Sequence, residues 1–172
     1  MQQQFKVSVA EILGHPGEYR DVTIEAQLTD VSNALGRLTG EPVEGQLRAE
    51  SVVEGVLVTG RVQALAEFDC ARCLKPVPAT LDVELCELYT APGHEAPPEE
   101  ESYRIEDQDI DLEPMLRDAV ALAMPLKPVC TEDCKGICPT CGHELNAGEC
   151  SCSEEELDPR WAALSDLRDK LA

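Results

Sequence analysis

Cysteine spacing constrains this chain more than any other feature of its sequence. Six of the nine cysteines lie within the 23 residues from Cys130 to Cys152, and a separate pair, Cys70 and Cys73, lies far upstream. Pairs of cysteines two or three positions apart suit a tetrahedral zinc ion, which takes thiolate ligands at short spacings and closes loops without a core of their own. Free or disulfide-bonded cysteines are the alternative, but short paired spacings in a cytosolic chain favour metal. The sequence therefore predicts metal binding.

The number of cysteines predicts two metal sites and one remaining thiol. Two closed four-thiolate sites use eight cysteines and leave Cys86, which lies in the alternating segment 80–88 and is expected to be a small, partly buried side chain. The preferred partition joins the distant pair to the first pair of the cluster. The predicted ligands are Cys70, Cys73, Cys130 and Cys134 in one site, and Cys138, Cys141, Cys150 and Cys152 in the other.

Alternatives to this assignment stay open in the sequence. A rival partition leaves two pairs without partners and groups Cys130, Cys134, Cys138 and Cys141. His143 can replace one cysteine, and an iron cluster held by thiolates is the chemical alternative to zinc. A zinc ion fully ligated by protein has no open position for water, so both sites are predicted to be structural.

The chain is also strongly acidic. Its 172 residues carry 14 Lys and Arg against 34 Asp and Glu, a formal net charge of −20. A charge of this sign repels nucleic-acid phosphates, which proteins neutralise with Lys and Arg, and attracts basic proteins. The densest negative stretch, residues 84–113, has eleven acidic side chains against Arg104 alone. This stretch is expected to break the strand pattern as a solvated loop, with a dedicated binding strip as the alternative.

Length and hydropathy favour a single soluble body. A chain of 172 residues suits one ordinary domain with a metal-stapled appendage. The N-terminus has neither a basic start nor an apolar run, so no signal peptide is expected. No window approaches the roughly 18 apolar residues of a membrane span. The expected location is the cytoplasm, with neither a membrane nor a small-molecule substrate as a partner.

Alternating apolar and polar residues predict an antiparallel meander of three to five strands. The alternation runs through five segments, residues 5–9, 22–28, 43–53, 56–68 and 81–85. Residues 33–42 are expected to be a loop, and Glu54-Gly55 a hairpin turn. The small residues Gly60, Ala64 and Ala66 favour enough curvature for a half-barrel.

One helix is expected to cover the apolar face of this sheet. Asp111 is its expected N-cap, Pro114 is tolerated in the first turn, and Pro125 and Pro128 end it. Its expected apolar face consists of Leu112, Met115, Leu116, Ala119 and Ala123, with Val120 beside them. A final helix begins at Asp158-Pro159 and carries a stripe of Trp161, Leu164, Leu167 and Leu171.

These elements predict an α+β fold in two parts. Residues 1–128 form the body of antiparallel β-structure and helix. Residues 129–172 form the cysteine-rich, zinc-binding C-terminal segment and the final helix, packed on the body as one unit.

With these motifs the chain resembles the YceD family, the large-subunit (23S) ribosomal RNA accumulation proteins of bacteria and plastids. The resemblance covers about residues 5–171 and rests on Cys70-Ala-Arg-Cys73-Leu74, Ile110-Asp111-Leu112, residues 130–136, Cys138-Pro-Thr-Cys141-Gly142, Leu145-Asn146, Asp158 and Arg160. It implies a role in making or keeping large-subunit ribosomal RNA. Family genes commonly adjoin that of a small zinc-ribbon protein of the large subunit, which implies a setting in ribosome assembly.

The leading hypothesis is a non-enzymatic assembly factor that binds a basic large-subunit ribosomal protein or a pre-ribosomal particle. Direct binding of ribosomal RNA is the first alternative, with Arg37, Arg48, Arg61, Arg72 and Lys75 as candidates. A thiol or metal enzyme is the second. No Ser-His-Asp set or carboxylate pair stands out, and the strands expected around Cys70 and Cys73 differ from the βαβ setting of redox Cys-x-x-Cys motifs.

Overall fold

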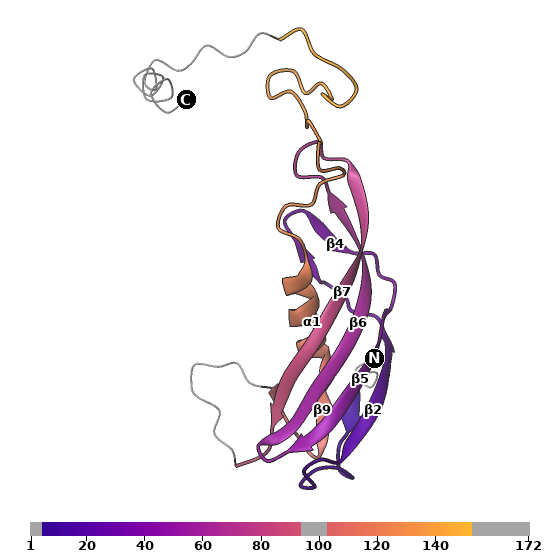
Figure 1. The fold of residues 1–172 in the computed structure, drawn as a ribbon, viewed down its shortest axis with the longest axis vertical. Coiled ribbons are helices and arrows are strands. Elements are labelled where there is room, and N and C mark those ends of the chain that lie inside the picture. The colour runs from indigo at the N-terminus through magenta and orange to yellow at the C-terminus, as the bar shows by residue number, and fades with distance from the viewer. Residues whose placement is uncertain (1–4, 94–102, 153–172) are drawn as a thin grey trace, which may run out of the picture. The chain divides into compact units, whose positions relative to one another are not determined.

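The computed structural model describes residues 5–93 and 103–152 (Figure 1). Its contacts divide the chain into two compact units, residues 1–134 and 135–172. The division follows Cys134 rather than residue 128, so Cys130 and Cys134 belong to the unit that contains the sheet. The acidic residues 95–101 and the expected final helix with its Trp161 stripe lie outside the described residues.

Four long strands form most of the main sheet in the first unit (Figure 1). They are β2 (Tyr19–Ala26), β5 (Val43–Val52), β6 (Gly55–Asp69) and β7 (Pro76–Thr90). Each pairs antiparallel with the next in the order β2-β5-β6-β7. The alternation of apolar residues therefore located these strands and predicted a mostly antiparallel sheet, which the structure confirms.

The remaining strands are short. A two-stranded antiparallel sheet contains β1 (Lys6–Ser8) and β9 (Asp109–Asp111). The hairpin of β3 (Ser32–Asn33) and β4 (Gly36–Leu38) joins the main sheet through β6, and β8 (Tyr103–Arg104) pairs with β7. Within residues 5–93 and 103–152 the main sheet thus has seven strands rather than three to five, and the β7–β8 pairing is parallel.

Two expected irregular segments contain strands instead. Residues 33–42 include β4, which pairs with β6 because Gly36 leaves room for the ring of Phe68 where a Cβ would stand. The stretch 84–113 does not break the pattern at its start, since β7 continues to Thr90. The exposed Glu87 interrupts the alternation by one position, and the buried Tyr89 resumes it. A single polar residue at an inward position therefore concealed the end of the strand.

The helix α1 (Leu112–Ala123) begins where its cap was predicted. The carboxylate of Asp111 accepts a hydrogen bond from the backbone N–H of Glu113 at 3.0 Å, as an N-cap does. Its buried side chains belong to the same hydrophobic core as the inward residues of the sheet, and they are Leu112, Met115, Leu116 and Val120. Ala123, expected on this face, is exposed. Figure 1 shows α1 beside β7, and the half-barrel stays a prediction.

No helix in the described ranges is long and apolar enough to cross a membrane.

Candidate metal centres

The hairpin loop between β6 and β7 carries the first cysteine pair. The pairing of Asp69 with Pro76 closes the hairpin and leaves the six residues 70–75 as its loop. Within this loop the N–H of Cys70 donates to the carbonyl of Lys75 at 2.8 Å, and the N–H of Leu74 donates to the carbonyl of Cys70 at 2.9 Å. Leu74 has a φ of 60° in the left-handed region, which reverses the chain. We call this loop the first knuckle.

A second pair, Cys130 and Cys134, lies in the segment that follows α1, and this segment contacts the first knuckle. The N–H of Ala71 donates to the carbonyl of Pro128 at 2.7 Å, which holds the incoming chain against the knuckle. The Arg72 guanidinium donates to the carbonyls of Glu132 at 3.1 Å and Cys134 at 2.8 Å. Arg72 thus ties the knuckle to the segment that carries the other two cysteines.

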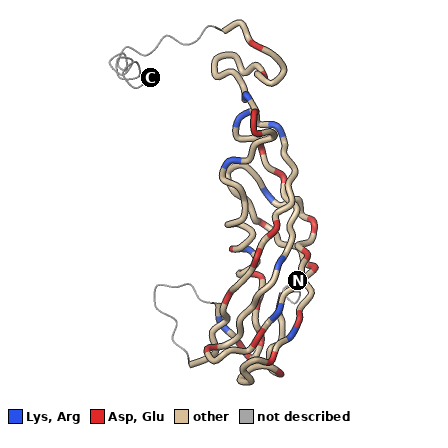
Figure 2. The backbone as a smooth tube through the Cα atoms, viewed as in Figure 1, with Lys and Arg blue, Asp and Glu red and all other residues tan. Residues whose placement is uncertain are grey.

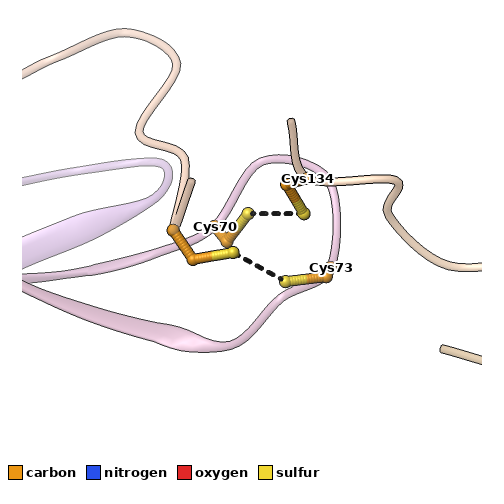
Figure 3. Close-up of side chains that lie close together, drawn as sticks. Cys70, Cys73 and Cys134 are labelled. Carbon is orange, nitrogen blue, oxygen red and sulfur yellow. Dashed lines mark hydrogen bonds between the residues drawn. The ribbon is translucent and has the colours of Figure 1, made fainter. Parts of the chain in front are cut away.

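The four sulfur atoms lie at distances that suit a tetrahedral metal ion. Sγ of Cys70 lies 3.8 Å from Sγ of Cys134 (Figure 3). Sγ of Cys73 lies 3.6 Å from Sγ of Cys130. All four lie within 4.8 Å of one another. A disulfide needs about 2.05 Å. A tetrahedron with metal–sulfur bonds of about 2.3 Å has edges of about 3.8 Å, so the group can hold a zinc-sized ion.

A second group of four cysteines lies in the second unit. Sγ atoms of Cys138, Cys141, Cys150 and Cys152 also lie within 4.8 Å of one another. The N–H of Cys138 donates to the carbonyl of His143 at 2.8 Å, and the N–H of Gly142 donates to the carbonyl of Cys138 at 2.9 Å. We call residues 138–143 the second knuckle. Its two hydrogen bonds connect the same positions as those of the first knuckle, although the sequences share only their cysteines.

Three further contacts close the second knuckle at its base. Ile137 forms an antiparallel bridge with Glu144, and the N–H of Leu145 donates to the carbonyl of Gly136 at 3.0 Å. The side chain of Asn146 accepts a hydrogen bond from the N–H of Lys135 at 2.7 Å. His143 contributes its backbone carbonyl, and its imidazole belongs to neither group of possible ligands in the described ranges.

The structure brings together the same two sets of four cysteines that the preferred partition named. The rival set, which joins residues 130–141, does not form a group in the described part of the chain. The ninth cysteine, Cys86, lies outside both groups. It is exposed rather than partly buried, because its position in β7 faces away from the core.

Opposing influences on the thiols explain what a cation supplies to the first group. Burial is the largest influence on Cys70 and raises its pKa, but surrounding backbone N–H groups outweigh burial and lower the pKa to about 6. The N–H of Lys75 is the largest influence on Cys73 and lowers its pKa, but burial and the neighbouring thiols raise it to about 12. One thiolate therefore lies beside a thiol that keeps its proton. Ionising the other thiols would place like charges side by side. A central cation offsets the repulsion between these thiolates and favours ionisation of all four cysteines.

The second group behaves in the same way. The N–H of Cys141, the largest influence, and that of Thr140 lower the pKa of Cys138 to about 6. The side chain of Cys141, followed by burial, raises the pKa of Cys152 to about 12. Sulfur-only ligands suit zinc or iron and not the hard cations magnesium and calcium. Both groups therefore have donors and spacing for a soft metal ion.

Leu74 occupies the position that Gly142 fills in the second knuckle, where φ is 72°. A left-handed φ costs a non-glycine residue roughly 1 kcal/mol, and Leu74 is 60% exposed, so its side chain contributes little burial. We expect Leu74→Gly to raise the free energy of unfolding by about 0.5–1 kcal/mol, measured by urea denaturation of the metal-loaded protein.

Leu65→Gly is the matched control. Leu65 is also partly exposed, at 45%, but lies within β6, so glycine there should lower the free energy of unfolding by about 1 kcal/mol. If both variants lose stability equally, the backbone conformation of Leu74 is not under strain.

The chain is thus a protein of mostly antiparallel β-structure, with one cysteine knuckle on a hairpin and a second knuckle further along the chain. The family model "Large ribosomal RNA subunit accumulation protein YceD" matches residues 58–168, which include both knuckles. The chain belongs to this family, which confirms the resemblance seen in its motifs.

Relatives extend this similarity. An uncharacterized protein of Mycobacterium tuberculosis strain H37Rv is 47% identical over 131 residues, which are 74% of this chain and 63% of the relative. The chain therefore spans less than two thirds of that relative. The chloroplastic "Large ribosomal RNA subunit accumulation protein YCED homolog 1" of Arabidopsis thaliana is 36% identical over 66 residues, 38% of this chain and 21% of the relative. The uncharacterized YlbN of Bacillus subtilis is 24% identical over 151 residues, 86% of each chain. No solved structure matches.

Proposed function

We propose that this protein is a non-enzymatic factor in large ribosomal subunit biogenesis, which supports accumulation of the 23S RNA by binding a basic ribosomal protein or a pre-ribosomal particle. Membership of the YceD family supports the role in ribosomal RNA accumulation. The net charge of −20 supports a basic protein, rather than bare RNA, as the partner. We place this activity in the cytoplasm.

The pairing of the arginines with carboxylates is the observation that favours a protein over RNA as the partner. Three of the five candidate RNA-binding residues lie on the outer face of the sheet, and each pairs with a carboxylate. The pairs are Arg37 with Glu67 at 3.8 Å, Arg48 with Asp21 at 2.9 Å, and Arg61 with Glu84, whose carboxylate accepts from the Arg61 Nε at 2.8 Å. Figure 2 shows basic and acidic positions mixed along these strands. Internal pairing leaves these cations less able to neutralise phosphates.

The other two candidates lie in the first knuckle. Arg72 donates to two backbone carbonyls and holds the knuckle to its second pair of cysteines. Lys75 accepts the N–H of Cys70 with its carbonyl, so its backbone also serves the knuckle. The side chain of Arg72 therefore has a structural task that explains its presence without RNA, whereas the carbonyl of Lys75 would serve the knuckle with any side chain.

For the metal we propose one structural zinc ion in each group of four cysteines. Cys70, Cys73, Cys130 and Cys134 would hold the first ion, and Cys138, Cys141, Cys150 and Cys152 the second. Four thiolates complete the coordination of zinc and leave no position for a reacting water, which supports a role in folding rather than catalysis. An iron cluster is the alternative, and its visible absorption distinguishes it.

Binding measurements test the proposed partner. We expect at least one basic large-subunit protein, from a purified panel, to bind the full-length chain more tightly than naked large-subunit RNA does. Raising the salt concentration should weaken this binding, because charge between exposed groups is screened over about 8 Å at physiological ionic strength. Tight RNA binding with no bound protein would instead favour the RNA-binding alternative.

A further inference from the structure

The outer face of the main sheet has a groove across its four long strands. Its volume is about 920 Å³, and the polar side chains that line it point away from the core. The strand register places these side chains in rows that cross the sheet. One row contains Glu25, Glu44, Gln63 and Asp82, and the adjacent row contains Thr23, Gln46, Arg61 and Glu84.

The described residues give the groove a negative charge, and the one cation among them is already paired. Four carboxylates of the described residues line it against Arg61 alone, and Arg61 forms an ion pair with Glu84. Asp82 accepts a hydrogen bond from the side-chain amide of Gln63 at 2.6 Å. The groove therefore excludes phosphate groups and attracts a cationic ligand.

Glu25 and Glu44 make the groove more than a generally acidic surface. They are direct cross-strand partners of β2 and β5, and both side chains are exposed on the same face. Neither forms an ion pair with a described residue of the chain. Like charges directly opposite one another on a sheet are destabilising. A cation placed between these two carboxylates converts their repulsion into attraction.

We propose that this groove is the docking surface for an extended, Lys- or Arg-bearing segment of the protein partner, with one of its cations between Glu25 and Glu44. The identity of the partner rests on the proposed function, whereas the surface rests on the groove and its charge. Thr23, Gln46 and Gln63 add neutral hydrogen-bonding groups beside the carboxylates. An extended segment presents alternate side chains to one side, which suits a groove across a sheet.

The double variant Glu25→Gln/Glu44→Gln tests this assignment in the full-length chain. Two probes are used: the panel of basic large-subunit proteins, and a short synthetic peptide with lysine at every second position. We expect the variant to weaken binding of both roughly fivefold, since two exposed ion pairs of about 0.5 kcal/mol each are lost. The matched control, Glu11→Gln/Glu54→Gln, removes the same charge from two exposed turn residues and should change binding less than twofold.

The same variants test the repulsion in the absence of a partner. Glu25→Gln/Glu44→Gln should raise the Tm of the isolated chain above that of the control variant, and high salt should reduce the difference. An unchanged Tm at low salt would contradict the argued repulsion.

The possible failures are distinguishable. If a panel protein binds the wild-type chain and both double variants equally well, the groove is not the docking surface while the proposed function stands. If no panel protein binds, the proposed function fails. Binding of the lysine peptide alone then tests whether the groove is a docking surface for a cationic segment. Equal binding of that peptide to the wild-type chain and the groove variant would overturn the cationic assignment.

Discussion

Purified full-length protein should contain two zinc ions per chain, and Cys70→Ser should contain one. Serine at this position removes a buried thiolate whose sulfur lies 3.8 Å from that of Cys134, so the first group loses a ligand while the second keeps its four. Metal–ligand free energy is folding free energy in loops of this kind, on the order of 10 kcal/mol for a structural zinc site. Residues 126–134 should therefore become sensitive to protease in the variant. Elemental analysis and limited proteolysis measure the two effects.

Cys86→Ser is the matched control for this substitution. Cys86 is exposed and belongs to neither group, so the control should keep two zinc ions and its protease resistance. Two ions in Cys70→Ser would show that Cys70 is not a ligand, and an iron–sulfur absorption band in the wild type would rule out the assignment of zinc.

Metal retention should also fall as the pH falls, because protons compete with the metal for the sulfur atoms. In the absence of metal, Cys70 and Cys138, with pKa values of about 6, are largely ionised at neutral pH. Cys73 and Cys152, with pKa values of about 12, keep their protons and must release them when metal binds. Acidification below about pH 6 protonates the first two as well, so chelators should remove the metal faster there.

Gly55→Ala should reduce the free energy of unfolding by about 3 kcal/mol or more. Gly55 begins β6 directly after the turn at residues 53–54, with a φ of 155°, and pairs with both Val52 and Thr90. A Cβ there would overlap the backbone carbonyl oxygen of Tyr89 and would approach the N–H of Ala91. Backbone atoms held in strand pairing cannot move aside as a flexible side chain can, so strain adds to the unfavourable φ. Urea denaturation measures the loss.

Gly40→Ala is the control that separates the cost of the positive φ from the cost of crowding against Tyr89. Gly40 also has a positive φ, at 87°, but a Cβ there meets no atom of the described residues within 4 Å. This control should lose only the conformational part, about 1 kcal/mol. Equal losses in the two variants would show that crowding against Tyr89 contributes nothing.

Much of the fold could be predicted from local sequence patterns, because the interactions behind those patterns are local. Inward-facing side chains recur at every second position of a strand, so the alternation located β5 and β6 closely. Asp111 could be identified as a cap because its carboxylate needs only the N–H of Glu113, two residues away. β4 escaped prediction because three residues contain too little alternation, and its pairing depends on the distant Phe68.

The spacing of the cysteines likewise predicted which residues could bind metal, since the two members of each pair lie two to four positions apart in the chain. The sequence also placed the chain in the YceD family through those same motifs. It did not reveal that Leu74 holds the left-handed conformation of Gly142, although the matching Cys-x-x-Cys positions offered that comparison.

Only the tertiary structure decided which pairs of cysteines meet and which charges face one another. Cys70 and Cys134 are 64 residues apart, and the β6–β7 hairpin and the end of α1 bring them together. Glu25 and Glu44 are opposed because β2 and β5 pair in one register, and a shift of one residue would have turned one of them to the core. Spacing along the chain specifies local geometry, whereas contacts between distant segments depend on how the sheet and helix pack.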